Sequence, residues 1–180
     1  MAEMYFVALV APKEINDDVL RWKNAMKERF DCSVALRSPA HITLVPPFWM
    51  DESLENKLQN EIRDFSQRQA SFEINLKNFS AFKPRVIFVD VIANYFLQTF
   101  QAHLLQFLVT PNIFPIEKED RPFHPHITIA TRDLHKKSFH EAWGIFKEKT
   151  YEASWLVNSM SLLRHNQKNW DVIFTSQFPN

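Results

Sequence analysis

The hydrophobic and polar positions of the chain divide it into short apolar runs, typical of strands, and longer amphipathic segments, typical of helices. Residues 5–10 form an unbroken apolar run, which predicts a buried central strand. In residues 16–31 the apolar side chains recur at helical spacing, which predicts a helix. Residues 33–36 and 41–45 are predicted to be extended. Pro46-Pro47 should close the second of these segments, because proline cannot donate to a sheet ladder.

Apolar runs and amphipathic segments continue along the rest of the chain. Further helices are predicted over residues 51–69, 95–109 and 133–149, and further strands over 71–79, 86–92, 124–131, 151–163 and 170–178. The last two strands flank a polar turn and should pair as an antiparallel hairpin. Asp133 is the expected N-cap of the last helix. Residues 111–122 contain three prolines and predict a long loop, of the kind that often borders a functional site.

Two of the predicted strands carry nearly the same tetrapeptide. His41-Ile42-Thr43-Leu44 lies in the first half of the sequence and His126-Ile127-Thr128-Ile129 in the second. Successive side chains of a strand point to opposite faces, so each histidine shares a face with the threonine two positions later. Chance explains one such motif more readily than two. We therefore expect two neighbouring strands that bring two imidazoles and two hydroxyls together.

The order of the predicted elements suggests an internal duplication. The strand–helix–strand–helix series that precedes Ser71 is echoed after it, and the two motifs start about half the chain apart. This predicts an α+β fold made of two pseudo-twofold lobes, each an antiparallel sheet with helices packed outside. Both His-x-Thr strands would line a central cleft. We expect residues 1–180 to form a single domain of two intertwined lobes.

Composition narrows the class of protein. The single Cys32 excludes an intrachain disulfide and suits a reducing compartment. The sequence has no run of the ~20 apolar residues that a membrane span requires, and its start lacks a basic segment followed by a long apolar one. We expect a cytoplasmic protein with no membrane partner and, by default, a monomer. The 21 basic residues balance the 21 acidic ones, which disfavours binding of long nucleic-acid tracts but allows a compact anionic ligand.

Two imidazoles and two hydroxyls suit cleavage of a phosphodiester. One histidine can remove a proton from water while the other gives a proton to the departing sugar oxygen, and both titrate near neutrality. The hydroxyls of Thr43 and Thr128 can donate hydrogen bonds to phosphate oxygens as negative charge builds on them. The near-identical motifs do not reveal whether His41 or His126 is the acid.

These residues carry a resemblance to a known family. The two motifs, with Pro39 before the first and Pro47-Phe48 after it, resemble the 2H phosphoesterase superfamily, and most of all the branch with bacterial 2′-5′ RNA ligase and cyclic phosphodiesterase proteins. The resemblance implies a bilobal α+β fold and hydrolysis of cyclic phosphodiesters, typically 2′,3′-cyclic phosphates at RNA or nucleotide ends, without a metal or other cofactor. Reversible 2′-5′ ligation is a further activity of such relatives.

The resemblance also implies residue roles. His41, Thr43, His126 and Thr128 take the catalytic positions, and family analogy slightly favours His41 as the acid. In some members the first arginine after the second motif contacts phosphate. Here that residue is Arg132, one position later than the spacing expected from relatives.

Three further residues are candidates for substrate binding. Phe48 is expected to stack on a base or, equally, to pack in the core. Arg121, in the proline-bearing loop, is a candidate phosphate ligand. His124 is expected in a loop or beside the motif histidine, where it would support substrate binding.

The same residues also allow two other functions. A binding module would hold a nucleotide or RNA end in the same cleft without turnover. A zinc hydrolase would use His41, His124 and His126 as metal ligands, since the last two fall on one face of a strand. Against zinc, Pro125 follows His124, and the threonine of each motif would have no role around the metal.

Overall fold

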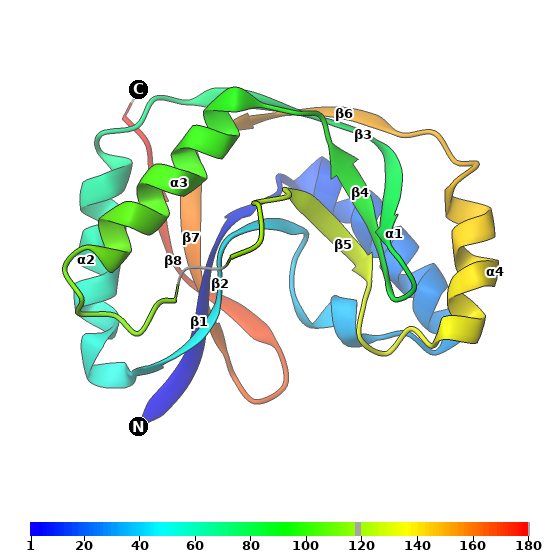
Figure 1. Cartoon of the computed structure of the whole chain (residues 1–180), viewed down its shortest axis with the longest axis horizontal. Coiled ribbons are helices and arrows are strands. Elements are labelled where there is room, and N and C mark those ends of the chain that lie inside the picture. Colours follow the sequence, from blue (N-terminus) through cyan, green and yellow to red (C-terminus); the bar gives the residue numbers. More distant parts are fainter. Residues whose placement is uncertain (118–119, 180) are drawn as a thin grey trace.

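The computed structural model describes residues 1–117 and 120–179, which form two four-stranded antiparallel sheets (Figure 1). The first sheet has the strand order β2 (His41–Asp51), β1 (Ala2–Val10), β7 (Ser159–His165) and β8 (Trp170–Gln177). The second has the order β5 (His126–Ala130), β4 (Val86–Val91), β3 (Phe72–Phe82) and β6 (Glu152–Val157). The predicted α+β class with antiparallel sheets is confirmed, and each motif strand lies at the edge of its own sheet.

Four α-helices in the described part of the chain cover the outer faces of the sheets. They are α1 (Lys13–Phe30), α2 (Glu55–Ser66), α3 (Tyr95–Val109) and α4 (Lys136–Phe146). The helices α2 and α3 pack on the first sheet, whereas α1 and α4 pack on the second (Figure 1). Each motif strand is thus contacted by a helix that follows a strand of the other sheet. The helix α3, which follows β4, contacts β2, and the helix α1, which follows β1, contacts β5. Gln101 on α3 shows this exchange, because its Nε2 donates to the backbone oxygen of Leu44 on β2 at 3.0 Å.

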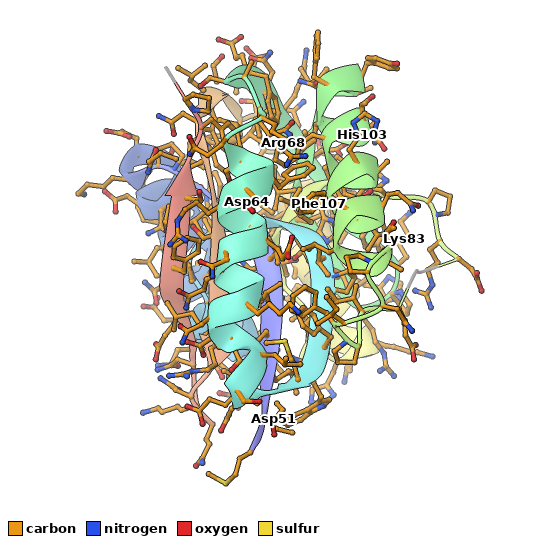
Figure 2. All side chains as sticks on the ribbon, turned by 90° about the vertical axis from the view of Figure 1, so that its left-hand side faces the viewer. Asp51, Asp64, Arg68, Lys83, His103 and Phe107 are labelled. Atoms are coloured by element: carbon orange, nitrogen blue, oxygen red, sulfur yellow. The ribbon has the colours of Figure 1, made fainter. Side chains whose placement is uncertain are left out.

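The helices α2 and α3 lie side by side against the first sheet (Figure 2). Phe107 lies between them, with its ring centroid 5.5 Å from that of Phe65 and beneath the guanidinium of Arg68. His103 lies on the exposed side of α3. This packing follows the predicted apolar stripes, and the helix predicted over residues 95–109 is confirmed at both ends.

The duplication is real, but the two halves of the chain do not each form one sheet. The repeated unit is a strand, a helix and a motif strand, namely β1–α1–β2 and β4–α3–β5. The other two strands of the first sheet, β7 and β8, come from the carboxyl-terminal end of the chain. The segment 151–163 was predicted as one strand and is two, because the chain passes at Asn158 from β6 in one sheet to β7 in the other. The predicted hairpin is therefore confirmed only for β7 and β8.

The strand β2 continues through Pro46 and Pro47 to Asp51, although these prolines were predicted to end it. Val45 pairs with Val7 and Phe48 with Tyr5, and the register shifts between these pairs. The prolines fall in this irregular stretch of an edge strand, where no ladder hydrogen bond is required of them.

Residues 33–36 were predicted as extended, but a 3₁₀ helix, η1, covers Val34–Arg37. The carboxylate of Asp133 explains the difference, since it accepts the backbone N–H groups of Ser33 at 2.6 Å and Val34 at 2.8 Å. Asp133 therefore does not cap the last helix, which begins at Lys136 after His135. It instead joins the segment after the second motif to the segment before the first.

No helix in the described part of the chain is both long and apolar enough to cross a membrane.

Candidate active site

The two motif strands meet where the two sheets approach each other. The edge strands β2 and β5 lie in contact along this junction. In both, the isoleucine after the histidine is fully buried, whereas the histidine and the threonine are only partly buried. The alternation predicted from the sequence thus places the imidazoles and hydroxyls on the open side of each strand. All four polar side chains line one of two adjoining cavities at this junction.

Both imidazoles are oriented by the same local contact. The Nδ1 of His41 lies 2.7 Å from the carbonyl oxygen of Pro39, and the Nδ1 of His126 lies 2.7 Å from that of His124. A carbonyl oxygen only accepts, so each Nδ1 carries the proton in the hydrogen bond. The Nε2 atom of each ring is left to exchange a proton with a ligand.

The environment of His41 is apolar and cationic. The ring of Phe6 packs against it with centroids 4.9 Å apart, and Val10 is its partner on the neighbouring strand β1. Burial, together with the positive charges of Lys23 and His126, lowers the pKa of His41 to about 4, against the opposing effect of the Pro39 carbonyl. An imidazole in such a place is neutral near pH 7.

Lys23 is itself an unusual residue, because its side chain is only 3% exposed. Its ammonium donates to the backbone oxygen of Ser38 at 3.0 Å, next to the Pro39 carbonyl that orients His41. Burial lowers the pKa of Lys23 to about 8. A buried cation therefore lies behind the first motif.

The environment of His126 is aromatic and contains a carboxylate. Phe88 and Phe82 pack against its ring, with centroids 4.9 and 5.1 Å away. Its partner on the neighbouring strand β4 is Asp90, at the position that Val10 occupies beside His41. Burial lowers the pKa of His126 from its ordinary value, whereas the hydrogen bond with the His124 carbonyl and, to a lesser extent, the Asp90 carboxylate raise it.

His124, two residues earlier, lies between the second motif and that carboxylate. Its Nε2 is 3.7 Å from Oδ1 of Asp90, and its ring centroid is 6.2 Å from that of His126. Its own positive charge, when present, lowers the pKa of His126. His124 is thus beside the motif histidine, as the sequence suggested.

We call the larger of the two cavities the aromatic cavity. It has a volume of about 600 Å³, and its walls include Phe82, Leu105, Phe123, Gln101, Arg121 and His124. His126 and Thr43 also line it. Its rings offer flat apolar faces, and its polar side chains offer donors and acceptors for the edge of a base.

The smaller cavity has a volume of about 320 Å³ and adjoins the first at Thr43. We call it the cationic cavity. Its walls include His41, Thr128, Arg37, Arg132, His165 and Trp170.

The structure brings seven of the eight predicted site residues to these cavities, and the exception is Phe48. Its side chain is 8% exposed and faces the core, where its ring centroid lies 6.3 Å from that of Tyr5. Its stacking role is therefore not supported, because a residue six positions after Ile42 falls on the buried face of the strand.

Several residues of the site were not found from the sequence. They are Lys23, Phe82, Asp90, Gln101, Arg37 and Trp170. Each comes from an element other than the motif strands, so only the tertiary fold reveals its place. Asp90 had one local signal, as a single carboxylate within an apolar run.

The alternative of a zinc site was tested on the same geometry. Across residues 1–117 and 120–179, no three His, Cys, Asp or Glu side chains are grouped as a metal site requires. His41, His124 and His126 therefore do not form the three-histidine arrangement that the zinc interpretation needed.

Comparison with known proteins agrees with the fold. The chain is 28% identical over 173 residues to a protein of Staphylococcus epidermidis named "Putative phosphoesterase", covering 94% of this chain and 95% of that one. It is 30% identical to the RNA 2′,3′-cyclic phosphodiesterase of Bacillus subtilis over 96 residues, and this match covers 51% of each chain. The crystal structure of E. coli LigT complexed with 3′-AMP superposes with a TM-score of 0.71 over 100% of both chains, at 18% identity.

A family model also matches most of the chain. The model described as the 2′-5′ RNA ligase superfamily matches residues 11–169, which include both motifs, the whole second sheet, and β2 and β7 of the first. The chain therefore belongs to the 2′-5′ RNA ligase superfamily.

Proposed function

We propose that this protein hydrolyses cyclic phosphodiesters, with 2′,3′-cyclic phosphates at nucleotide or RNA ends as its substrates, by acid–base catalysis from its two motif histidines and without a metal. The observation that carries the proposal is the pair of imidazoles on facing edge strands. Each is oriented through Nδ1 by a backbone carbonyl, so that Nε2 is available to a ligand. The name of the Bacillus subtilis relative supports the choice of substrate.

In the proposed reaction a water molecule attacks the phosphorus of the cyclic phosphate. One histidine takes a proton from the water as the new oxygen–phosphorus bond forms. The bond from phosphorus to one ribose oxygen breaks, and the other histidine gives that oxygen a proton. The product is a ribose phosphate monoester, and proton exchange with solvent restores both imidazoles. Thr43 and Thr128 donate hydrogen bonds to the phosphate oxygens that do not react.

The two environments favour His41 as the base and His126 as the acid. A base must begin neutral, and the buried Lys23 cation and the apolar contacts keep His41 in that form. An acid must begin protonated, and the Asp90 carboxylate favours the protonated form of His126. This assignment is opposite to the one that family analogy favoured. It rests on residues outside the motifs, which differ between the two lobes.

The assignment sets the pH dependence. Activity rises with pH as His41 loses its proton, near pH 4. It falls again as His126 loses its own, below the ordinary imidazole pKa of 6.5. We therefore expect a bell-shaped profile of kcat/KM with its maximum on the acid side of pH 6.5.

The experiment that tests the function is hydrolysis of a nucleoside 2′,3′-cyclic phosphate and of a short RNA with a cyclic-phosphate end, with EDTA present. We expect turnover by the wild-type protein and a loss of ~10²-fold or more in His41→Ala and in His126→Ala. His103→Ala, an exposed histidine on α3, is the matched control and should keep full activity. Chromatography of the product identifies the 2′- or 3′-phosphate.

Loss of turnover in EDTA that returns with a divalent metal would contradict the metal-independent mechanism. Binding of the nucleotide without turnover of either substrate would contradict the enzymatic function and leave a binding protein.

A further inference from the structure

The cationic cavity differs from the aromatic cavity in the sign of its charge. Its charged side chains are those of Arg37 and Arg132, with His165 beside them, and no described carboxylate lines it. The aromatic cavity instead contains Glu117 together with Arg121. A ligand that lies between the two motifs therefore meets an electropositive wall on one side only.

The two arginines lie next to a hydrogen-bonded joint between two backbone segments. Arg37 ends the 3₁₀ helix η1, and Arg132 immediately precedes Asp133. The Asp133 carboxylate accepts the N–H groups at the start of η1 and also the thiol of Cys32, at 3.0 Å. These hydrogen bonds lower the pKa of Asp133, so the joint stays ionised at neutral pH. Both guanidinium groups thus project from segments whose relative position is fixed.

Both guanidinium groups lack a partner in the described part of the chain. Arg37 and Arg132 are exposed, and neither forms an ion pair or a side-chain hydrogen bond with any residue in the described ranges. By contrast, the neighbouring Arg164 is bound to Glu55 at 2.8 Å. Two unpaired arginines at the mouth of a cavity can each present a planar pair of donors to an anion.

Aromatic side chains form another part of the wall of the cationic cavity. The ring of Trp170 packs edge-on against that of Phe6, with centroids 4.6 Å apart, and against that of His165 at 4.9 Å. Phe6 also contacts His41. The wall of the cavity therefore includes a run of ring contacts that begins at the motif histidine, and the sugar of a nucleotide can lie against it.

We propose that the cationic cavity binds a second phosphate group of the substrate, held by Arg37 and Arg132, while the reacting phosphate lies between the two motifs. The preferred substrate is then a nucleotide that carries a further phosphate, and not a nucleoside cyclic phosphate. This inference rests on the proposed function only for the position of the first phosphate. The second phosphate can be a 5′-terminal phosphate or the internucleotide phosphate of an RNA chain, since both offer the same oxygens.

Calorimetry on the full chain tests the proposal without any need for turnover. Three ligands are compared at low salt: adenosine 3′-monophosphate, adenosine 3′,5′-bisphosphate, and the dinucleotide ApAp with a 3′-terminal phosphate. We expect the bisphosphate to bind about tenfold or more tightly than the monophosphate, because charge-assisted hydrogen bonds form to the second phosphate. The gain should shrink as salt is added. An equal gain with ApAp identifies a chain phosphate as sufficient, whereas a gain with the bisphosphate alone identifies a terminal phosphate.

Variants locate the second phosphate. In Arg37→Ala and Arg132→Ala the ratio of the two dissociation constants should fall toward one, and Arg37→Lys should restore part of it. Lys57→Ala, an exposed residue on α2, should keep the ratio. Equal affinities for the mono- and bisphosphate in the wild-type protein would overturn the proposal. So would a preference that survives in the Arg37→Ala/Arg132→Ala double variant.

This result is separable from that of the turnover assay. A protein that hydrolyses the cyclic phosphate but shows no gain from the second phosphate keeps the proposed function and loses this inference. A protein that shows the gain but no turnover keeps the second-phosphate site and loses the enzymatic function.

Discussion

The two motif regions are alike in what they present to the cleft and unlike in what stands behind it. Each has a histidine oriented by the carbonyl two residues earlier and a threonine on the same face of an edge strand. Behind His41 are Val10 on the next strand and the buried Lys23 cation. Behind His126 the corresponding position holds the Asp90 carboxylate.

The difference shows how a duplicated motif can divide one reaction into two roles. Two identical imidazoles in identical surroundings would compete for one proton. Burial lowers the pKa of both rings, and a cation behind one and a carboxylate behind the other act in opposite directions on the two pKa values. In the pH range between those two values one ring is neutral while the other is protonated. In the proposed reaction the division of roles would therefore come from the neighbouring elements and not from the motifs.

The features that the two regions share should be needed equally. Thr43→Val and Thr128→Val keep the shape of the side chain but remove the donor to the phosphate oxygens. We expect each to lower kcat/KM for the cyclic phosphate by about 10²-fold, the size seen when a transition-state hydrogen-bond donor is removed. Serine at the same position should restore most of the activity. A loss confined to one of the two threonines would show that the lobes differ here as well.

Exchanging the charge behind the histidines should move the pH profile. In Asp90→Asn the pKa of His126 falls, because the carboxylate that raises it is gone. The alkaline limb of kcat/KM should then move to lower pH, and activity at pH 7 should fall several-fold. Val10→Asp places a carboxylate beside His41 and should move the acid limb to higher pH. A profile unchanged in both variants would remove the electrostatic basis of the assignment.

Removing the buried cation tests the other half of the difference. In Lys23→Met the pKa of His41 rises, so the acid limb moves to higher pH while the alkaline limb stays in place. Activity near neutral pH should change little, since His41 remains neutral there. A shift of the alkaline limb instead would indicate that Lys23 acts on His126.

Lys23 also contributes to the pH dependence of stability. Its folded pKa of about 8 lies below the ordinary lysine value of 10.5. The wild-type protein is therefore destabilised by this charge below pH 8 and loses that cost as the pH rises toward 10.5. Relative to wild type, Lys23→Met should be most stable at neutral pH, and denaturant unfolding at several pH values measures the trend.

Phe48 follows the first motif and should have the smallest effect on activity. Phe48→Leu leaves a small cavity beside Tyr5 in the core and should lower the free energy of unfolding by about 1 kcal/mol, with KM unchanged. Urea unfolding and steady-state kinetics together check this. A raised KM with unaltered stability would return Phe48 to the binding site.

The local pattern predicted what depends on neighbouring residues. The alternation of His41, Ile42 and Thr43 was sufficient to place the polar side chains on one face, and the apolar stripe of residues 95–109 was sufficient to bound α3. The side chains that distinguish the two motifs could not be predicted in this way. Asp90 is beside His126 only because β4 pairs with β5, and Lys23 is behind His41 only because α1 packs there.

The same limit explains the errors. The 3₁₀ helix at Val34–Arg37 depends on a carboxylate from Asp133, which lies far along the chain. The division of residues 151–163 between two sheets depends on which strands they pair with, and no proline or glycine marks the break at Asn158. A local pattern of apolar residues does not predict which strands pair or which charged groups from distant segments come into contact.

The most direct test of the central claim is the effect of the leaving group on the two histidine variants. A p-nitrophenyl ester of a nucleoside 3′-phosphate loses p-nitrophenolate, which leaves without a proton, whereas the ribose oxygen of a cyclic phosphate requires one. If His126 is the acid, His126→Ala should lose ~10²-fold or more on the cyclic phosphate but only a few-fold on the ester, and His41→Ala should be impaired on both. The opposite result, with His41→Ala restored by the activated ester and His126→Ala not, would contradict the assignment.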